Sequence, residues 1–242
     1  WTSGAQVADY GILLARTDPE LPKHQGLTFF LLDMRLPGVE VRPIKQISGH
    51  SEFNEVFFDD VILDDAWRLG EINQGWSVAM HALTAERFKR LNTRMPSMQS
   101  VRQLAEDCAL EGVKAIDVDS VRQKLAGNLA NKCALEHFMS RMLTQLSNGE
   151  ELGSEASILK LVSCQLNQDL SAYAMDLLEE GGTILDPVSH PLLAELYDAY
   201  LWTPGLRIAG GADEILLNII AERSLGLPGE PRSDKGKAFK AL

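Results

Sequence analysis

The sequence predicts an α+β protein in which a small antiparallel β domain is followed by an antiparallel helical bundle. Short apolar runs bounded by Gly, Pro and Asp fill the first 65 or so residues, and this pattern is typical of strands. After residue 75 the apolar residues recur every three or four positions, which is the spacing of helices that bury one face. Strands that precede helices, rather than alternate with them, indicate the α+β class.

We expect strands in four segments, each rich in β-branched or aromatic residues. These segments are residues 12–16, 27–32, 39–44 and 55–61. The links between them are short, and short links favour antiparallel pairing, in a meander or a small barrel.

The later helices are predicted to pack antiparallel, because long apolar stripes are joined by short loops. The first begins near residue 75, and the others span about 119–147, 154–180, 191–200 and 212–225. Ser154 is a candidate N-cap. The glycines of Asn148–Gly149 and Gly181–Gly182 supply stops.

The change of period places a domain boundary near residues 66–73. We therefore expect a β domain at 1–70, a helical bundle at 71–228 and a polar tail at 229–242. The tail is expected to be loose. The chain starts at Trp1, inside a structured pattern, so we interpret it as the later portion of a longer protein.

Composition excludes several classes of function. The 242 residues are 45% hydrophobic and carry a net charge of −11 without any Lys/Arg-rich block, which argues against nucleic acid and against an anionic membrane surface. Three cysteines without a CxxC pair indicate buried free thiols and a reducing, intracellular compartment. The five histidines show no ligand spacing, so no metal site is predicted.

Glu86 is a lone acid within the amphipathic segment 83–88 of the first expected helix. Lys89 and Arg90 follow three and four residues later, and a Glu with cations at this spacing is usually a solvated surface pair. Helix geometry alone favours that reading over a catalytic one.

A resemblance to a known family adds to this picture. Several ordered segments are similar to acyl-CoA dehydrogenases, of the bacterial type: Trp1-Thr2-Ser3, residues 52–61, Leu69-Gly70-Glu71, Gly75-Trp76, residues 208–215, residues 218–223 and residues 225–228. The resemblance implies the middle β domain and the C-terminal helical bundle of that fold, with the N-terminal helical domain lying before Trp1.

The resemblance implies α,β-dehydrogenation of an acyl-CoA thioester, in which a carboxylate removes the α-proton and a hydride passes to N5 of FAD. In many members the base precedes Gly-Thr in the closing motif, where this chain has Gly210. In the isovaleryl-CoA dehydrogenase arrangement the base lies in a Leu-x-x-Glu-Arg setting, which Leu83–Arg87 matches. The resemblance thus moves the interpretation of Glu86 from a surface acid to the catalytic base.

Further site residues follow from the same resemblance. Arg87, Ala82 and Gly210 are assigned to the substrate pocket. The cofactor-binding residues are Trp1 against the flavin ring, Ser3 near its N5, Gly181 and Gly182 towards the FAD of a neighbouring subunit, Gly211 and Glu214. For each a structural reading stays open, such as a tight helix stop at Gly181–Gly182 or first-turn acids at Asp213 and Glu214.

The sequence departs from the family at two places. Ala212 stands where many members have a flavin-contacting Thr, and the Arg-x-x-Phe-Gly segment that meets the FAD pyrophosphate is missing. Lys114 or Arg122 could take the place of that Arg. These departures keep two alternatives open, namely a non-catalytic or cofactor-holding subunit of a hetero-oligomer, and an acyl-CoA oxidase of the same fold.

The resemblance also implies partners and a setting. We expect an acyl-CoA substrate from fatty acid or steroid side-chain metabolism, an electron-transfer flavoprotein as electron acceptor, and a homo- or hetero-oligomer, either a dimer or a tetramer. The expected location is the cytoplasm of a bacterium.

Overall fold

A computed structural model describes residues 1–89, 96–150, 152–183, 191–231, 234 and 236–242. The side chains of residues 84–89, 180 and 183 lie outside the described part. By its internal contacts the chain divides into two compact units. The first unit comprises Trp1–Glu86 with Glu230–Leu242, and the second comprises Arg87–Gly229.

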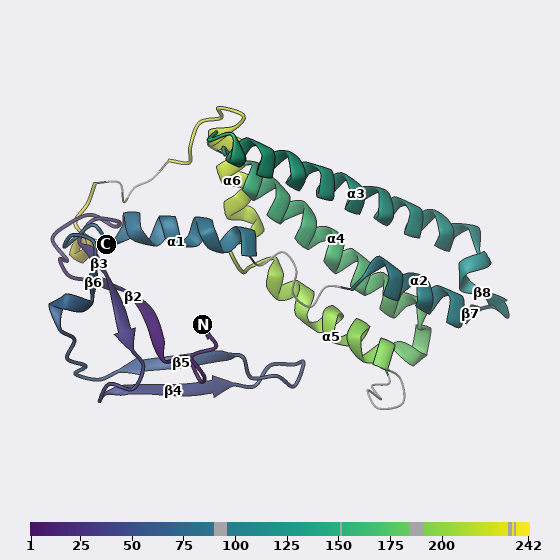
Figure 1. Cartoon of the computed structure of the whole chain (residues 1–242), viewed down its shortest axis with the longest axis horizontal. Helices are drawn as coiled ribbons and strands as arrows, with labels where there is room; N and C mark the ends of the chain where they lie inside the picture. The colour runs from purple at the N-terminus through teal and green to yellow at the C-terminus, as the bar shows by residue number, and fades with distance from the viewer. Residues whose placement is uncertain (90–95, 151, 184–190, 232–233, 235) are drawn as a thin grey trace. The chain divides into compact units, whose positions relative to one another are not determined.

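The first unit contains two small antiparallel sheets (Figure 1). One has the order β1 (Thr2–Ser3), β5 (Phe53–Phe58), β4 (Val39–Ile44), and the other β2 (Tyr10–Arg16), β3 (Leu27–Asp33), β6 (Arg68–Leu69). The predicted strands and their antiparallel pairing are confirmed, with registers such as Leu13 opposite Phe30 and Val41 opposite Val56. The strands do not form one meander, because the chain leaves β3 for the other sheet and returns as β6.

The last predicted strand is shorter than expected. β5 ends at Phe58, because the next two residues turn. The N–H of Asp59 donates to the carbonyl of Gly38 at 2.9 Å, and Asp60 has a φ of 47°. A left-handed Asp ends a strand because its backbone leaves the extended region.

α1 (Gly75–Lys89) begins against β3. A Cβ added to Gly75 would lie 2.6 Å from the backbone nitrogen of Phe29, so only glycine lets the helix start this close to the strand. Phe29 and Leu32 of β3 are buried. The tight approach therefore ties the start of α1 to the core of the first unit.

The end of the chain packs on the first unit, so the expectation of a loose tail is wrong for residues 236–242. The N–H groups of Phe239 and Lys240 donate to the carbonyls of Leu21 and Pro19 at 3.0 and 3.1 Å. The Arg16 guanidinium lies 3.9 Å from the centre of the Phe239 ring, which is a cation–π contact.

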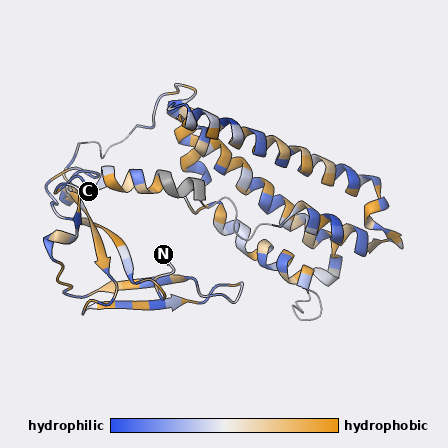
Figure 2. Cartoon of the chain, viewed as in Figure 1, coloured by the Kyte–Doolittle hydropathy of each residue, from blue (hydrophilic) through white to orange (hydrophobic). Residues whose placement is uncertain are grey.

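The second unit is a helical bundle followed along the chain from blue-green to yellow in Figure 1. It contains α2 (Met98–Asp107), the hairpin β7 (Ala109–Leu110) and β8 (Val113–Lys114), α3 (Asp119–Ser147), α4 (Glu155–Leu177), α5 (Pro191–Leu206) and α6 (Asp213–Arg223). α4 packs against each of the other helices of this unit. Its core includes Val101, Leu125, Leu170, Ala174 and Leu196. In Figure 2, apolar and polar residues alternate along α3, as expected for a helix with one buried face.

Three details of the bundle differ from the prediction. α2 was not predicted, although Val101, Leu104 and Ala105 form a buried stripe and Ser97 caps it by accepting from the N–H of Ser100 at 2.8 Å. α5 continues past Tyr200 to Leu206 and includes Pro204. Ser154 precedes α4 but makes no side-chain cap bond.

No helix in the described ranges is both long and apolar enough to cross a membrane.

Candidate active site

β1, which contains Ser3 and directly follows Trp1, is held in place by a buried amide. Asn54, on β5, is almost fully buried, and its Nδ2 donates to the carbonyl of Thr2 at 3.0 Å and to Oε1 of Gln6 at 2.6 Å. Gly4, which follows the last residue of β1, donates its N–H to the carbonyl of Glu52 at 2.8 Å. With the backbone fixed, the Trp1 side chain is 84% exposed, and Ser3 is exposed as well. Trp1 and Ser3 thus offer an open indole and a hydroxyl to a planar ligand.

The start of α1 is fixed by a cluster of hydroxyl and amide groups. The fully buried Thr28 hydroxyl accepts from the N–H of Asn73 at 3.0 Å and lies 2.7 Å from the hydroxyl of Thr17. Thr17 in turn donates to Oδ1 of Asn73 at 2.7 Å. Asn73 has a φ of 66°, and this left-handed turn sends the chain into α1.

Glu86 and Arg87 lie on α1 by their backbone, but their side chains lie outside the described residues. Their predicted roles are therefore untested by the side-chain geometry. Ala82, one turn earlier, is exposed within the first unit, and Leu83 is 41% exposed. Ala79, about one turn before Ala82 and Leu83 on the same face of the helix, is buried. This part of α1 thus presents small and apolar side chains outside the core of its own unit.

A glycine turn lies between α5 and α6 in the second unit. Gly210 and Gly211 have φ values of 64° and 104°, which favour glycine. A Cβ on Gly210 would meet nothing within 4 Å, whereas one on Gly211 would lie 3.2 Å from Leu216. No hydrogen bond from the N–H groups of Gly210 and Gly211 to the described part of the chain is observed. Glu214 follows in the first turn of α6 and is exposed.

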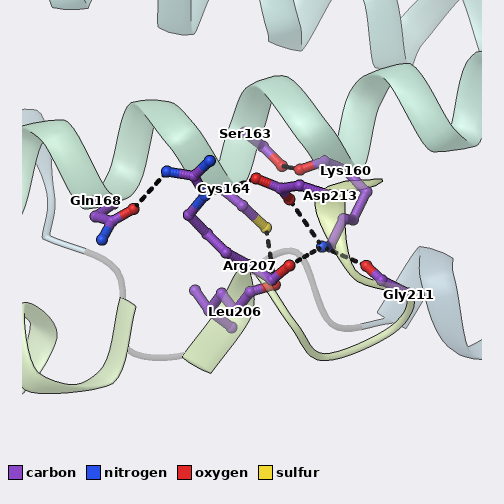
Figure 3. A network of polar contacts seen from close by, with 8 residues as sticks. All are labelled: Lys160, Ser163, Cys164, Gln168, Leu206, Arg207, Gly211 and Asp213. Atoms are coloured by element: carbon purple, nitrogen blue, oxygen red, sulfur yellow. Dashed lines mark hydrogen bonds and ion pairs between the residues drawn. The ribbon is translucent and has the colours of Figure 1, made fainter. Parts of the chain in front are cut away.

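The glycine turn is anchored to α4 by a polar network (Figure 3). Nζ of Lys160 donates to the carbonyl of Gly211 at 2.7 Å and to that of Arg207 at 3.3 Å. It also lies 3.5 Å from Oδ1 of Asp213. Nε of Arg207 donates to Oδ2 of Asp213 at 2.6 Å, and the Arg207 guanidinium reaches Oε1 of Gln168 at 3.0 Å. Sequence reasoning missed Lys160, although a Lys within an apolar helix stripe is a signal of a buried cation.

Gly181 and Gly182 lie just beyond the other end of α4, in a short 3-10 helix, Glu179–Thr183. A Cβ on Gly182 would lie 3.0 Å from the carbonyl oxygen of Met175, which supports its reading as a tight helix stop. Leu177 lies 17 positions after Lys160 along α4, which corresponds to a rise of about 25 Å. Within one chain the glycine pair and the glycine turn therefore lie at opposite ends of α4.

The segment that should contain Arg-x-x-Phe-Gly forms the β7–β8 hairpin. Its turn, Glu111–Gly112, has φ values of 50° and 83°, and Lys114 on β8 is exposed. Arg122 on α3 lines a groove of about 690 Å³ between α2 and α3. The wall of this groove also includes Met98, Arg102, Glu106, Ile116 and Leu125. Both cations that could replace the missing Arg are thus present near the hairpin, on different elements.

The cysteines differ in exposure. Cys164 on α4 is buried, Cys108 is half-buried and Cys133 is exposed, so the expectation of three buried thiols is wrong for Cys133. Burial raises the pKa of the Cys164 thiol and also that of Cys108. Among the described residues, no three His, Cys, Asp or Glu side chains form a group that could hold a metal ion.

A family model described as "Acyl-CoA dehydrogenase, C-terminal domain" matches residues 73–225. These residues contain the whole bundle and the glycine turn. The chain belongs to the acyl-CoA dehydrogenase family. The resemblance noted in the sequence is therefore confirmed, as is the fold class, because solved members share the fold.

Two relatives from Mycobacterium tuberculosis illustrate the relationship. The acyl-CoA dehydrogenase FadE34 is 37% identical over 229 residues, which are 94% of this chain and 30% of FadE34. The acyl-CoA dehydrogenase IpdE1 is 34% identical over 233 residues, which are 96% of this chain and 59% of IpdE1. This member of the acyl-CoA dehydrogenase family thus spans less than two thirds of each of these relatives.

Two solved structures are similar in fold and in sequence. The "Tcur3481-Tcur3483 steroid ACAD" has a TM-score of 0.80 and 26% identity, covering 95% of this chain and 59% of that one. The ChsE4-ChsE5 complex from Mycobacterium tuberculosis has a TM-score of 0.77 and 25% identity, covering 95% of this chain and 60% of that one.

Proposed function

We propose that the protein carrying this chain dehydrogenates an acyl-CoA thioester at its α,β bond, with Glu86 as the base that removes the α-proton. The proposal rests on which residues occupy the two positions where members of the family carry the base. Gly210 has no side chain to act as a base, and Glu86 lies on α1. If the reaction needs a carboxylate at one of the two positions, Glu86 is the one available.

The chemistry asks two things of Glu86. Its carboxylate must reach the α-carbon, and its pKa must rise towards neutrality so that it can accept a proton from a weak carbon acid. An apolar, water-poor pocket raises a carboxylate pKa in this way. Ala82 and Leu83 on α1 are small or apolar and exposed within their unit. These side chains support a pocket wall of the required kind.

The residues at β1 fit the FAD that the family implies. The open indole of Trp1 can cover one face of a flavin ring, and the exposed hydroxyl of Ser3 can donate to a ring nitrogen. FAD, when bound, supplies the hydride acceptance at N5. Gly211, Glu214, Gly181 and Gly182 are the proposed further contacts. Since the two glycine pairs lie at opposite ends of α4, we propose that they serve different FAD molecules of an oligomer.

The glycine turn supports binding of the thioester. The N–H groups of Gly210 and Gly211 make no hydrogen bond to the described residues, and Gly210 is exposed. Unpaired backbone donors next to a ligand can stabilise a carbonyl oxygen on which negative charge develops. We assign Gly210 to the substrate pocket on this basis and on the resemblance. Arg87 is assigned to it on the resemblance alone.

The proposed partners follow from the relatives. An acyl-CoA is the substrate, and because one structural neighbour is described as a steroid ACAD, steroid-derived acyl-CoA thioesters are the first to test, beside fatty acyl-CoA. An electron-transfer flavoprotein is the proposed electron acceptor.

A second reading is a non-catalytic or cofactor-holding subunit of a hetero-oligomer. It is favoured by the absence of an acid or a hydroxyl at Gly210 and Ala212, and by the neighbour that is described as a complex of two chains. Copurification with a related chain, together with inactivity alone, would support this reading over the first.

The test is flavin bleaching by acyl-CoA in the protein as its host produces it. Under anaerobic conditions, Glu86→Gln should retain bound FAD and lose bleaching, while the control Glu71→Gln, an exposed acid before α1, should bleach like the parent protein. Undiminished bleaching in Glu86→Gln would remove the central claim. Peroxide formation during aerobic turnover would instead indicate an oxidase.

A further inference from the structure

Lys160 is a buried cation whose hydrogen-bonding capacity is fully used by one turn. Its residue is 7% exposed, and an ammonium group carries three donors and no acceptor. The three acceptors around it are the carbonyls of Arg207 and Gly211 and the Asp213 carboxylate. All three belong to the segment 207–213, which contains Gly210 and Gly211. Figure 3 shows the Lys160 side chain reaching from α4 to this segment.

The two carbonyls are placed so that Lys160 fixes both ends of the turn. The carbonyls of Arg207 and Gly211 belong to the peptide planes 207–208 and 211–212, which enclose residues 208–211. Each peptide is planar and moves as one unit, so a bond to its carbonyl sets the direction of the whole plane. Across the turn, the N–H of Asp213 donates to the carbonyl of Arg207 at 3.1 Å.

The turn needs such an anchor because of its composition. Two consecutive glycines with positive φ have more accessible conformations than any other pair. A hydrogen bond from a charged donor is shorter and stronger than a neutral one, and the Gly211 carbonyl lies at 2.7 Å. The ammonium therefore restrains the residues that have the greatest freedom.

Asp213 holds the cation in this position. Its carboxylate is buried and lies between Lys160 and Arg207, and Arg207 is itself held by Gln168. A buried cation needs a partner, because an unpaired charge in the interior is costly. The cluster thus anchors the turn that follows α5 to α4.

We propose that Lys160 is a positioning residue that sets the Gly210–Gly211 backbone for the acyl-CoA thioester. This inference rests on the proposed function, in which that backbone meets the thioester. Lys160 itself touches neither substrate nor cofactor. Its effect passes through the carbonyls of Arg207 and Gly211 to the peptide planes 207–208 and 211–212, which flank the segment that carries the Gly210 and Gly211 N–H groups.

The test compares Lys160→Met with Lys124→Met, which makes the same change at an exposed lysine of α3. In the protein with its FAD, amide hydrogen exchange of a peptide covering 206–214 should be faster in Lys160→Met and unchanged in Lys124→Met. Flavin reduction at saturating acyl-CoA should fall roughly 10- to 100-fold in Lys160→Met, as expected when reacting groups are misplaced by about 1 Å. FAD content and chemical reduction by dithionite should stay as in the parent.

Asp213→Asn is the second variant, for use where Lys160→Met does not fold. It keeps the shape of the side chain and removes the charge that holds the ammonium, so exchange at 206–214 should rise and acyl-CoA reduction should slow in the same direction. Parent-like exchange and parent-like reduction in a folded variant would overturn the role of Lys160. If the parent protein is not reduced by any acyl-CoA, the proposed function fails, while faster exchange at 206–214 would still support the anchoring of the turn.

Discussion

The hydroxyl of Thr28, fully buried in β3, accepts a hydrogen bond from the N–H of Asn73 at 3.0 Å. This bond joins the β core of the first unit to the turn from which α1 starts. The helix that carries Glu86 is therefore directed by a strand residue that lies almost sixty positions earlier.

Thr28→Val should test this link. Valine has the same shape but leaves the N–H of Asn73 and the hydroxyl of Thr17 without the Thr28 oxygen, so the free energy of unfolding should fall by about 1–3 kcal/mol. Urea unfolding is the measurement. Thr144→Val is the control, because its exposed hydroxyl only donates to Ser140 within α3, and it should change the stability by less than about 0.5 kcal/mol. Equal stability of the two variants would contradict the link.

Gly75→Ala should destabilise the protein although alanine is the better helix former. The added Cβ would meet backbone atoms of Thr28 and Phe29 at 2.6 Å, and relief of such an overlap costs about 1–3 kcal/mol. Gly127→Ala is the matched control, since a Cβ there meets nothing within 4 Å in the middle of α3. That control should stabilise the protein by about 0.5–1 kcal/mol. Opposite signs in thermal unfolding are the expected result, and a loss in both variants would count against the close approach at Gly75.

Gly210→Glu, introduced into Glu86→Gln, should restore part of the flavin bleaching by acyl-CoA. The first carbon of the new side chain has room, because a Cβ at Gly210 meets nothing within 4 Å. Its left-handed backbone costs about 1–2 kcal/mol for a residue with a side chain, so recovery should be incomplete. Glu86→Gln with Gly210→Gln carries the same backbone strain without a carboxylate and should stay inactive. Recovery with both residues would mean that something other than a base had been restored.

The sequence predicted the fold class and most elements, because these depend on local patterns. The apolar run 27–32 became β3, and the stripe that ends at Asn148 became α3. The division of the strands into two sheets was not predictable, because it depends on the distant pairings of β1 with β5 and β3 with β6. α2 was missed because it is short and its stripe of Val101, Leu104 and Ala105 was not recognised.

The candidate site divides in a similar way. Trp1, Glu86 and Gly210 were proposed as site residues from ordered motifs, each of which is local in the chain. Asn54 and Lys160 were not found, because their roles are contacts with residues about fifty positions away. A single sequence gives the residue types on a strand or helix but not the turn against which a buried side chain is packed.

The cysteines should react with iodoacetamide in order of their exposure. Cys133 is exposed and should be alkylated first, whereas Cys164 is buried and its pKa is raised by that burial. Only the thiolate reacts, and a raised pKa means less thiolate at a given pH, so the rate at Cys164 should keep rising with pH beyond the range in which an ordinary thiol is fully ionised. Peptide mass spectrometry after timed labelling at pH 7 to 10 measures each site.

The Cys164 thiol is ionised less easily in the folded chain than in the unfolded one. Its contribution to stability is therefore complete below the ordinary thiol pKa and is lost as the pH rises through the pKa of the folded state. Labelling of Cys164 as fast as Cys133 in the folded protein would show that α4 is not packed at this point.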